Sequence, residues 1–151
     1  MGGSVGGSVR CAVWGSPIGH SLSPVLHRAA YAALGLTEWS YERREVEVAG
    51  FVTALRRLGP EWRGLSLTMP LKEAAAAAAV RLDRAAIETG AANTLVRGPG
   101  GWAGHNTDVH GIRAALREVG GGSLRRALVV GSGATARSAL SALVGAGCTD
   151  V

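Results

Sequence analysis

The chain has 151 residues, of which 47% are apolar and 18% are charged, and its formal net charge at pH 7 is +5. This length suffices for one well-cored domain, or one domain and part of another, and the composition argues against a disordered protein. Because the arginines are scattered singly or in pairs with no aromatic residues between them, nucleic-acid binding is not expected.

The first part of the chain alternates strands and helices. After a Gly/Ser-rich tail at residues 1–8, the mostly apolar segment at 9–14 indicates a buried strand. Ser23 is a suitable helix N-cap, Pro24 suits the first helical position, and Gly35 is expected to end this helix. The next expected elements are a strand at 38–46, a helix at 50–58 and a strand at 64–68. This β-α-β-α-β order predicts an α/β fold with a mainly parallel sheet flanked by helices.

A further helix and a hairpin follow. Pro70 is expected to begin a helix that includes the alanines at 74–79, a stretch of high helix propensity. Residues 91–97 and 101–105 flank a Gly-Pro-Gly-Gly sequence, which is typical of a β-hairpin turn.

The chain is expected to divide near a Gly-rich linker. A helix at 108–119 ends in Gly120-Gly121-Gly122, the most linker-like stretch of the sequence. Beyond it, residues 125–130 indicate a buried strand that precedes a Gly-rich turn and a helix to about residue 145. One such βα unit cannot cover its own sheet, so the chain is expected to be part of a longer protein. The predicted parts are a first domain at 9–107, a connecting helix and linker at 108–123, and the start of a second domain at 124–151.

The Gly-rich turn has the G-x-G-x-x-A pattern between a strand and a helix. Glycines allow a pyrophosphate to approach the backbone, and the helix N-terminus presents free N–H groups to it. The pattern predicts a dinucleotide-binding turn, although glycines in a purely structural turn would explain it too. The residue that contacts the adenine ribose would lie at or beyond Val151, so NAD and NADP both stay open. The candidate cofactor-binding residues are Gly131, Ser132, Gly133, Ala134, Thr135 and Ala136.

Lys72 is the only lysine in the chain, beside fifteen arginines. It lies in the first turn of an expected helix, where the helix dipole disfavours a cation. A lysine can release its proton at working pH, whereas an arginine keeps it. Lys72 is therefore a candidate proton donor and acceptor, and a surface lysine paired with a nearby glutamate is an equally good interpretation.

Other polar residues occur at the ends of expected elements. Ser21 and Ser23 place two hydroxyl groups at a helix N-terminus, which suits a carboxylate, but Ser23 alone is better explained as a cap. Asn93 and Thr94 begin an apolar strand, where a buried amide needs a partner in the backbone or a ligand, although turn chemistry after Gly90 explains the asparagine nearly as well. Asp108 is expected to cap a helix, or to form an acid–base pair if a lysine lies beside it.

The histidines, the cysteines and the apolar runs bear on metal binding and on location in the cell. The histidines show no metal-ligand spacing, so no metal site is expected; they are His20, His27, His105 and His110. Cys11 and Cys148 are isolated, which fits a reducing cytoplasm. No run approaches the roughly 20 apolar residues of a membrane span, and the protein is expected to be cytoplasmic.

Several motifs in combination resemble the shikimate dehydrogenase family in their order and spacing. They are Ser21-Leu22-Ser23-Pro24, Thr68-Met69-Pro70-Leu71-Lys72, Gly90-Ala91-Ala92-Asn93-Thr94-Leu95, Asn106-Thr107-Asp108 and the Gly-rich turn. The resemblance covers residues 9–151 and implies a first domain that binds substrate and a second, Rossmann domain that binds NADP. It implies reversible NADPH-dependent reduction of 3-dehydroshikimate to shikimate, in aromatic amino acid (chorismate) biosynthesis.

The resemblance also implies a role for each matching residue. The expected substrate-binding residues are Ser21, Ser23, Thr68, Lys72, Asn93 and Asp108. The two serines would hold the substrate carboxylate, and the threonine, asparagine and aspartate would bind its ring hydroxyls. Lys72, assisted by Asp108, would exchange a proton with the reacting oxygen while hydride passes between the nicotinamide and the substrate. The alternatives are a quinate/shikimate dehydrogenase that uses NAD, and a non-catalytic substrate-binding fragment.

Overall fold

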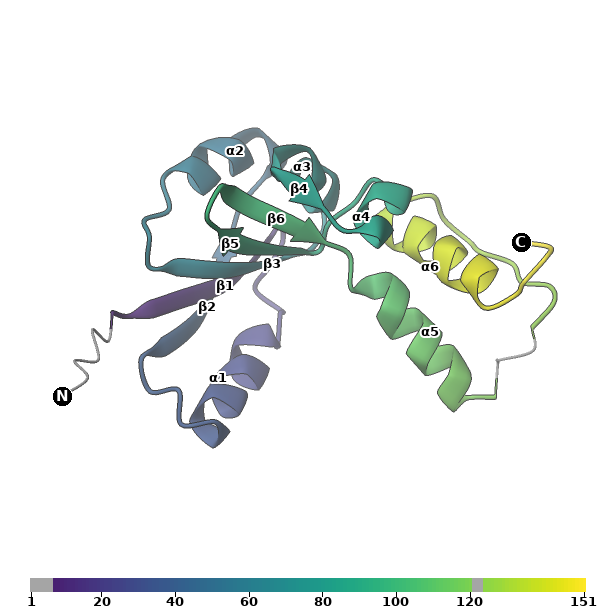
Figure 1. Cartoon of the computed structure of the whole chain (residues 1–151), viewed down its shortest axis with the longest axis horizontal. Helices are drawn as coiled ribbons and strands as arrows, with labels where there is room; N and C mark the ends of the chain where they lie inside the picture. The colour runs from purple at the N-terminus through teal and green to yellow at the C-terminus, as the bar shows by residue number, and fades with distance from the viewer. Residues whose placement is uncertain (1–6, 121–123) are drawn as a thin grey trace.

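The computed structural model describes residues 7–120 and 124–151. The strands in this part are β1 (Val9–Gly15), β2 (Trp39–Glu45), β3 (Trp62–Leu67), β4 (Arg81–Leu82), β5 (Thr94–Gly98) and β6 (Gly101–His105). The helices are α1 (Ser23–Ala33), α2 (Val48–Arg56), α3 (Lys72–Ala78), α4 (Arg84–Thr89), α5 (Asp108–Glu118) and α6 (Ala134–Gly145). The strands form one sheet in the order β2-β1-β3-β5-β6-β4, which confirms the predicted α/β class (Figure 1).

The sheet is mixed but mostly parallel. β1 runs parallel to both β2 and β3, and β6 runs parallel to β4. β5 is antiparallel to its neighbours β3 and β6. The predicted hairpin reverses the chain between β5 and β6, and Gly98 of β5 pairs with Gly101 of β6. Gly101 has a φ of 128°, a backbone conformation that favours glycine, so the predicted Gly-rich turn is confirmed.

The central strand β1 is buried on both faces. Ala12 and Trp14 face α2 and α3, where the Trp14 ring meets Phe51 edge to face at 6.1 Å between centroids. Cys11 and Val13 face the other side, which α1 covers (Figure 1). Successive side chains of a strand alternate between faces, so a strand between two helical layers is apolar throughout. This explains the continuous apolar run from Cys11 to Trp14.

Two predicted helix starts are misplaced: α1 begins one residue earlier than predicted, and α3 begins two residues later. Ser23 is the first helical residue of α1 rather than its N-cap, and the Ser21 Oγ accepts the hydrogen bond from the Ser23 amide at 3.4 Å. α3 begins at Lys72 rather than at Pro70, which lies in the preceding turn. The N-caps of both helices are leucines without a side-chain cap, so capping preferences misplaced these ends.

The sequence interpretation missed β4 and α4, which are short. α4 has an N-cap at Asp83, whose side chain accepts a hydrogen bond from the Ala86 amide at 2.7 Å. It ends at Gly90, which has a left-handed φ of 65°. An aspartate N-cap followed by a glycine C-cap is a recognisable helix signature, so these two residues could have revealed α4.

The predicted strand at 125–130 is not formed as a regular strand. One bridge joins Arg126 to Asp150, and the side chains of Leu128 and Val130 are 87% and 91% exposed. A strand needs neighbouring strands for its backbone hydrogen bonds, and Asp150 is the one residue that supplies a bridge in the described part of the chain. α6 nevertheless packs against α5 and α4 (Figure 1). Gly121 and Gly122 of the predicted linker lie outside the described residues, and the domain limits stay a prediction.

Candidate active site

The predicted substrate residues gather in one cavity of about 430 Å³. They are Ser21, Ser23, Thr68, Lys72, Asn93 and Asp108. The parallel strands β1 and β3 end at this edge of the sheet, and the antiparallel strand β5 begins there. Loops that follow β1 and β3 therefore meet the segment that precedes β5. Polar side chains at the carboxyl ends of parallel strands are where α/β proteins commonly bind ligands.

Lys72 and Asp108 are in direct contact. The Lys72 Nζ lies 2.6 Å from the Asp108 Oδ2, and the two side chains are 15% and 25% exposed. Each is the first residue of its helix, Lys72 of α3 and Asp108 of α5. The glutamate next to Lys72 is Glu73, which pairs instead with Arg137 of α6. The lysine is thus held inside the cavity by a carboxylate.

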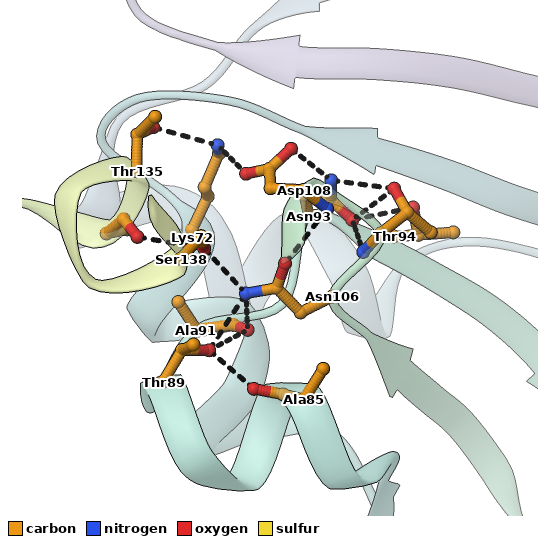
Figure 2. Close-up of polar contacts among 12 residues, drawn as sticks. Lys72, Ala85, Thr89, Ala91, Asn93, Thr94, Asn106, Asp108, Thr135 and Ser138 are labelled. Carbon is orange, nitrogen blue, oxygen red and sulfur yellow. Dashed lines mark hydrogen bonds and ion pairs between the residues drawn. The ribbon is translucent and has the colours of Figure 1, made fainter. Parts of the chain in front are cut away.

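Asn93 holds the second oxygen of this carboxylate. Its Nδ2 donates to the Asp108 Oδ1 at 2.7 Å and to the Thr107 Oγ1 at 2.9 Å (Figure 2). Its Oδ1 accepts from the Thr107 amide at 3.1 Å. Asp108 therefore has a cation on one oxygen and an amide on the other, which defines the orientation of its carboxylate.

The serine end of the cavity also contains polar groups that are not among the predicted substrate residues. Ser66 of β3 lines the cavity, and its Oγ accepts a hydrogen bond from the Tyr41 hydroxyl at 2.7 Å. Burial raises the pKa of Tyr41, so this residue acts as a neutral donor. Ser66 lies two positions before Thr68 in extended chain, where alternate side chains point to the same side. This spacing could have indicated from the sequence that Ser66 lies beside Thr68. His20 also lines the cavity.

A second cavity, of about 400 Å³, lies between the first turn of α3 and the Gly-rich turn. Lys72 lines both cavities, and its Nζ lies 3.4 Å from the Thr135 Oγ1. Of the six predicted cofactor residues, four line this space: Gly133, Ala134, Thr135 and Ala136. Gly131 and Ser132 line a different hollow, of about 420 Å³, on the other side of the turn.

The Gly-rich turn has the features of an anion site. Gly131 has a φ of 126°, which favours glycine, and a Cβ on Gly133 would meet nothing within 4 Å. Gly133 is the N-cap of α6, and no side chain caps this helix. The free N–H groups of the first turn can therefore bind an anion such as a pyrophosphate.

The described residues contain neither a metal-binding cluster nor a helix suited to a membrane. Within 7–120 and 124–151, no three His, Cys, Asp or Glu side chains are close enough together to hold a metal ion. No helix in those two ranges has the length and apolar character required to cross a bilayer.

Sequence comparisons identify relatives along nearly the whole chain. A family model described as the shikimate dehydrogenase substrate-binding domain matches residues 13–95, more than half of the chain. A shikimate dehydrogenase (NADP(+)) of Xanthomonas euvesicatoria is 42% identical over 143 residues, covering 93% of this chain and 50% of the relative. One of Rubrobacter xylanophilus is 44% identical over 142 residues, covering 91% and 49%. The chain thus spans about half the length of the curated relatives it matches.

Solved structures agree with this assignment. Mycobacterium tuberculosis shikimate dehydrogenase superposes with a TM-score of 0.84 at 47% identity, covering 94% of this chain and 52% of that one. A Thermus thermophilus shikimate 5-dehydrogenase, solved with NADP(H) and shikimate, gives a TM-score of 0.85 at 37% identity, with 94% and 54% covered. The chain belongs to the shikimate dehydrogenase family.

Proposed function

We propose that this chain is the substrate-binding half of an NADP-dependent shikimate dehydrogenase, which reversibly reduces 3-dehydroshikimate to shikimate in aromatic amino acid (chorismate) biosynthesis. The observation that carries the proposal is the 2.6 Å contact between the Lys72 Nζ and the Asp108 Oδ2 inside the larger polar cavity. The names of the relatives support the reaction, and the Thermus structure with NADP(H) and shikimate supports both ligands.

The serine end of the cavity would bind the substrate carboxylate. Ser21 and Ser23 supply hydroxyl donors where α1 begins, and the first turn of that helix adds a positive dipole end. Thr68 and Asn93 line the same cavity and would hydrogen-bond the ring hydroxyls. The serine pair, Thr68 and Asn93 would therefore orient the ring toward Lys72 from three places along the cavity.

Lys72 would then carry the proton of the reaction. Its ammonium group would donate to the carbonyl oxygen during reduction and recover the proton during oxidation. Asp108 keeps the ammonium oriented and would bind the neighbouring hydroxyl. An arginine could bind the same oxygen but would not release its proton. A bound nicotinamide dinucleotide supplies the hydride.

The residues of the Gly-rich turn fit the dinucleotide. Gly133, Ala134, Thr135 and Ala136 would hold its pyrophosphate at the start of α6. NADP rather than NAD rests on the names of the relatives. A quinate/shikimate dehydrogenase that uses NAD is the nearest alternative.

A non-catalytic substrate-binding unit is the second candidate. The observation that favours it is the state of residues 125–130, where a single bridge replaces the predicted strand. Leu128 and Val130 of this segment are largely exposed, whereas the sheet of the first domain has a buried core.

Calorimetric titration of the chain with shikimate and with NADPH, separately, tests the proposal. We expect shikimate to bind, and Lys72→Met to retain most of that affinity. In a longer protein with a complete dinucleotide-binding domain, Lys72→Met should reduce shikimate oxidation with NADP⁺ by orders of magnitude. Arg117→Met, which removes an exposed cation from α5, is the control and should change neither. Unchanged turnover in Lys72→Met would refute the role of the lysine. Binding of shikimate but not of NADPH would favour the non-catalytic unit. Failure of shikimate to bind would contradict both candidate functions.

A further inference from the structure

Asn106 joins three parts of the fold. It lies between β6 and α5, its side chain is 4% exposed, and it is not among the predicted substrate residues. Its Oδ1 accepts from the Asp108 amide at 3.0 Å. Its Nδ2 lies within hydrogen-bond distance of three acceptors, the Thr89 Oγ1 at 2.8 Å, the Ala91 carbonyl at 3.1 Å and the Ser138 Oγ at 3.0 Å (Figure 2).

The chemistry of these partners allows one orientation of the amide. The Asp108 amide can only donate and the Ala91 carbonyl can only accept, so the oxygen of Asn106 must face Asp108. Ser138 uses its own proton on the Ala134 carbonyl at 3.0 Å, which leaves its oxygen free to accept. Asn106 therefore donates to α6 with one end of its side chain and fixes the start of α5 with the other.

This contact differs from the other links between α6 and the rest of the protein. Arg137 pairs with Glu73 and donates to the Thr89 carbonyl at 2.7 Å, Ser141 contacts Glu88, and Thr135 contacts Lys72; each of these contacts is at least partly exposed to water. Ser138 is fully buried, and among the side-chain pairs that link α6 to the rest of the described residues, Asn106–Ser138 has both partners buried. The Asn106 Nδ2 has two protons for three acceptors, so without Ser138 both protons would still reach Thr89 and Ala91, and what would be lost is the buried contact that ties Asn106 to α6.

We propose that Asn106 is a positioning residue that, through Ser138, couples the placement of Asp108 to that of α6, the helix that follows the Gly-rich turn. The inference rests on the proposed function, in which Asp108 serves the substrate and the turn serves the dinucleotide. Asn106 would touch neither ligand. It would hold the Lys72–Asp108 pair and the Gly-rich turn in a fixed position relative to each other.

The test compares two alanine variants on the same helix in the full 151-residue chain. Ser138→Ala removes the acceptor of Asn106, and Ser141→Ala removes a hydroxyl whose partner is the exposed Glu88. Alanine favours helix, so both variants should fold, which circular dichroism checks. Because Lys72 is the only lysine, isotope labelling of lysine at Cε yields one NMR resonance, and this resonance reports the Lys72–Asp108 contact directly.

We expect Ser138→Ala to shift the Lys72 resonance and to accelerate hydrogen exchange of the Asp108 amide by about fivefold or more, because Asn106, whose Oδ1 accepts from that amide, would be held less firmly. Ser141→Ala should leave both unchanged. A folded Ser138→Ala protein with the wild-type resonance and exchange rate would overturn the proposal. Should that variant unfold, Ser138→Cys keeps the volume with a weaker acceptor, and an unchanged resonance there would overturn it equally.

The two proposals fail in different ways. The response of the Lys72 resonance to Ser138→Ala needs no ligand, so it measures the coupling alone. Titrating shikimate into the wild-type chain and following the same resonance measures the proposed function alone. If the Lys72 resonance shifts in Ser138→Ala but does not shift when shikimate is added, the coupling is supported and the proposed substrate is contradicted.

Discussion

At the scale of single residues, the candidate site is organised around the carboxylate of Asp108. Lys72 contacts one oxygen and Asn93 the other, at 2.6 Å and 2.7 Å. The Asn93 amide is itself held by Thr107 through its Oδ1. A carboxylate bound on both sides cannot turn away from the lysine, so the pair keeps its geometry without a ligand.

Asn93→Ala should therefore weaken both stability and ligand binding. It leaves the Asp108 Oδ1 and the Thr107 amide without their partner, which should cost about 1 kcal/mol of unfolding free energy. Shikimate affinity should fall because a proposed ring contact is lost. Urea denaturation and calorimetry measure the two effects. Ser40→Ala, which removes an exposed hydroxyl on β2, is the control, and equal effects in both variants would contradict the prediction.

At the scale of elements, the end of β1 and the turn before α3 approach each other closely. A Cβ on Gly15 would lie 2.4 Å from the Thr68 Cγ2 and 2.8 Å from the Met69 carbonyl oxygen. The Ser16 amide donates to the same Met69 carbonyl at 3.0 Å. A glycine at this position therefore allows the two segments to meet and brings Thr68 to the cavity.

Gly15→Ala should force these segments apart. Overpacking of this kind costs about 1–3 kcal/mol, and here it should also displace Thr68 and reduce shikimate affinity. Gly19→Ala is the matched control, because a Cβ on Gly19 would meet nothing within 4 Å. Thermal unfolding and calorimetry compare the two variants. A Gly15→Ala protein as stable as Gly19→Ala would show that the turn can move freely.

At the scale of the whole molecule, the layer between the sheet and α1 contains ionisable groups that burial keeps neutral. Burial raises the pKa of Cys11, Tyr31 and Tyr41. Each group is neutral when protonated, so the folded protein holds its protons more tightly than the unfolded chain. The stabilisation is complete below the unfolded pKa values and is lost as pH rises from them through the raised pKa values of the folded protein.

We expect the free energy of unfolding to fall above about pH 8.5, where an unfolded cysteine ionises, and more steeply near about pH 10, where unfolded tyrosines do. Tyr41→Phe should make this decline shallower because it removes one of the three groups. Urea denaturation across this pH range measures the slope, with Ser40→Ala as a variant of unchanged titration. A slope identical in Tyr41→Phe and the wild-type chain would mean that this layer does not control alkaline stability.

Much of the fold and of the site could be predicted, for identifiable reasons. The apolar run of β1 and the Gly-rich hairpin between β5 and β6 carry strong local signals, and both are confirmed. The helix starts at Ser23 and Lys72 were misplaced because backbone geometry rather than side-chain caps determines them. The prediction of a strand at 125–130 was wrong because a strand depends on neighbouring strands, which the local sequence does not provide.

The sequence by itself determined the α/β class and the identity of the polar residues, since periodicity, turn chemistry and the lone lysine are local properties. Only the tertiary structure decided which of these residues meet. Lys72 and Asp108 are separated by 36 positions and lie 2.6 Å apart because α3 and α5 begin at the same edge of one sheet. Asn106 and Ser138, 32 positions apart, are joined by the packing of α6. Contacts between distant segments depend on strand order and helix packing, which no local pattern encodes.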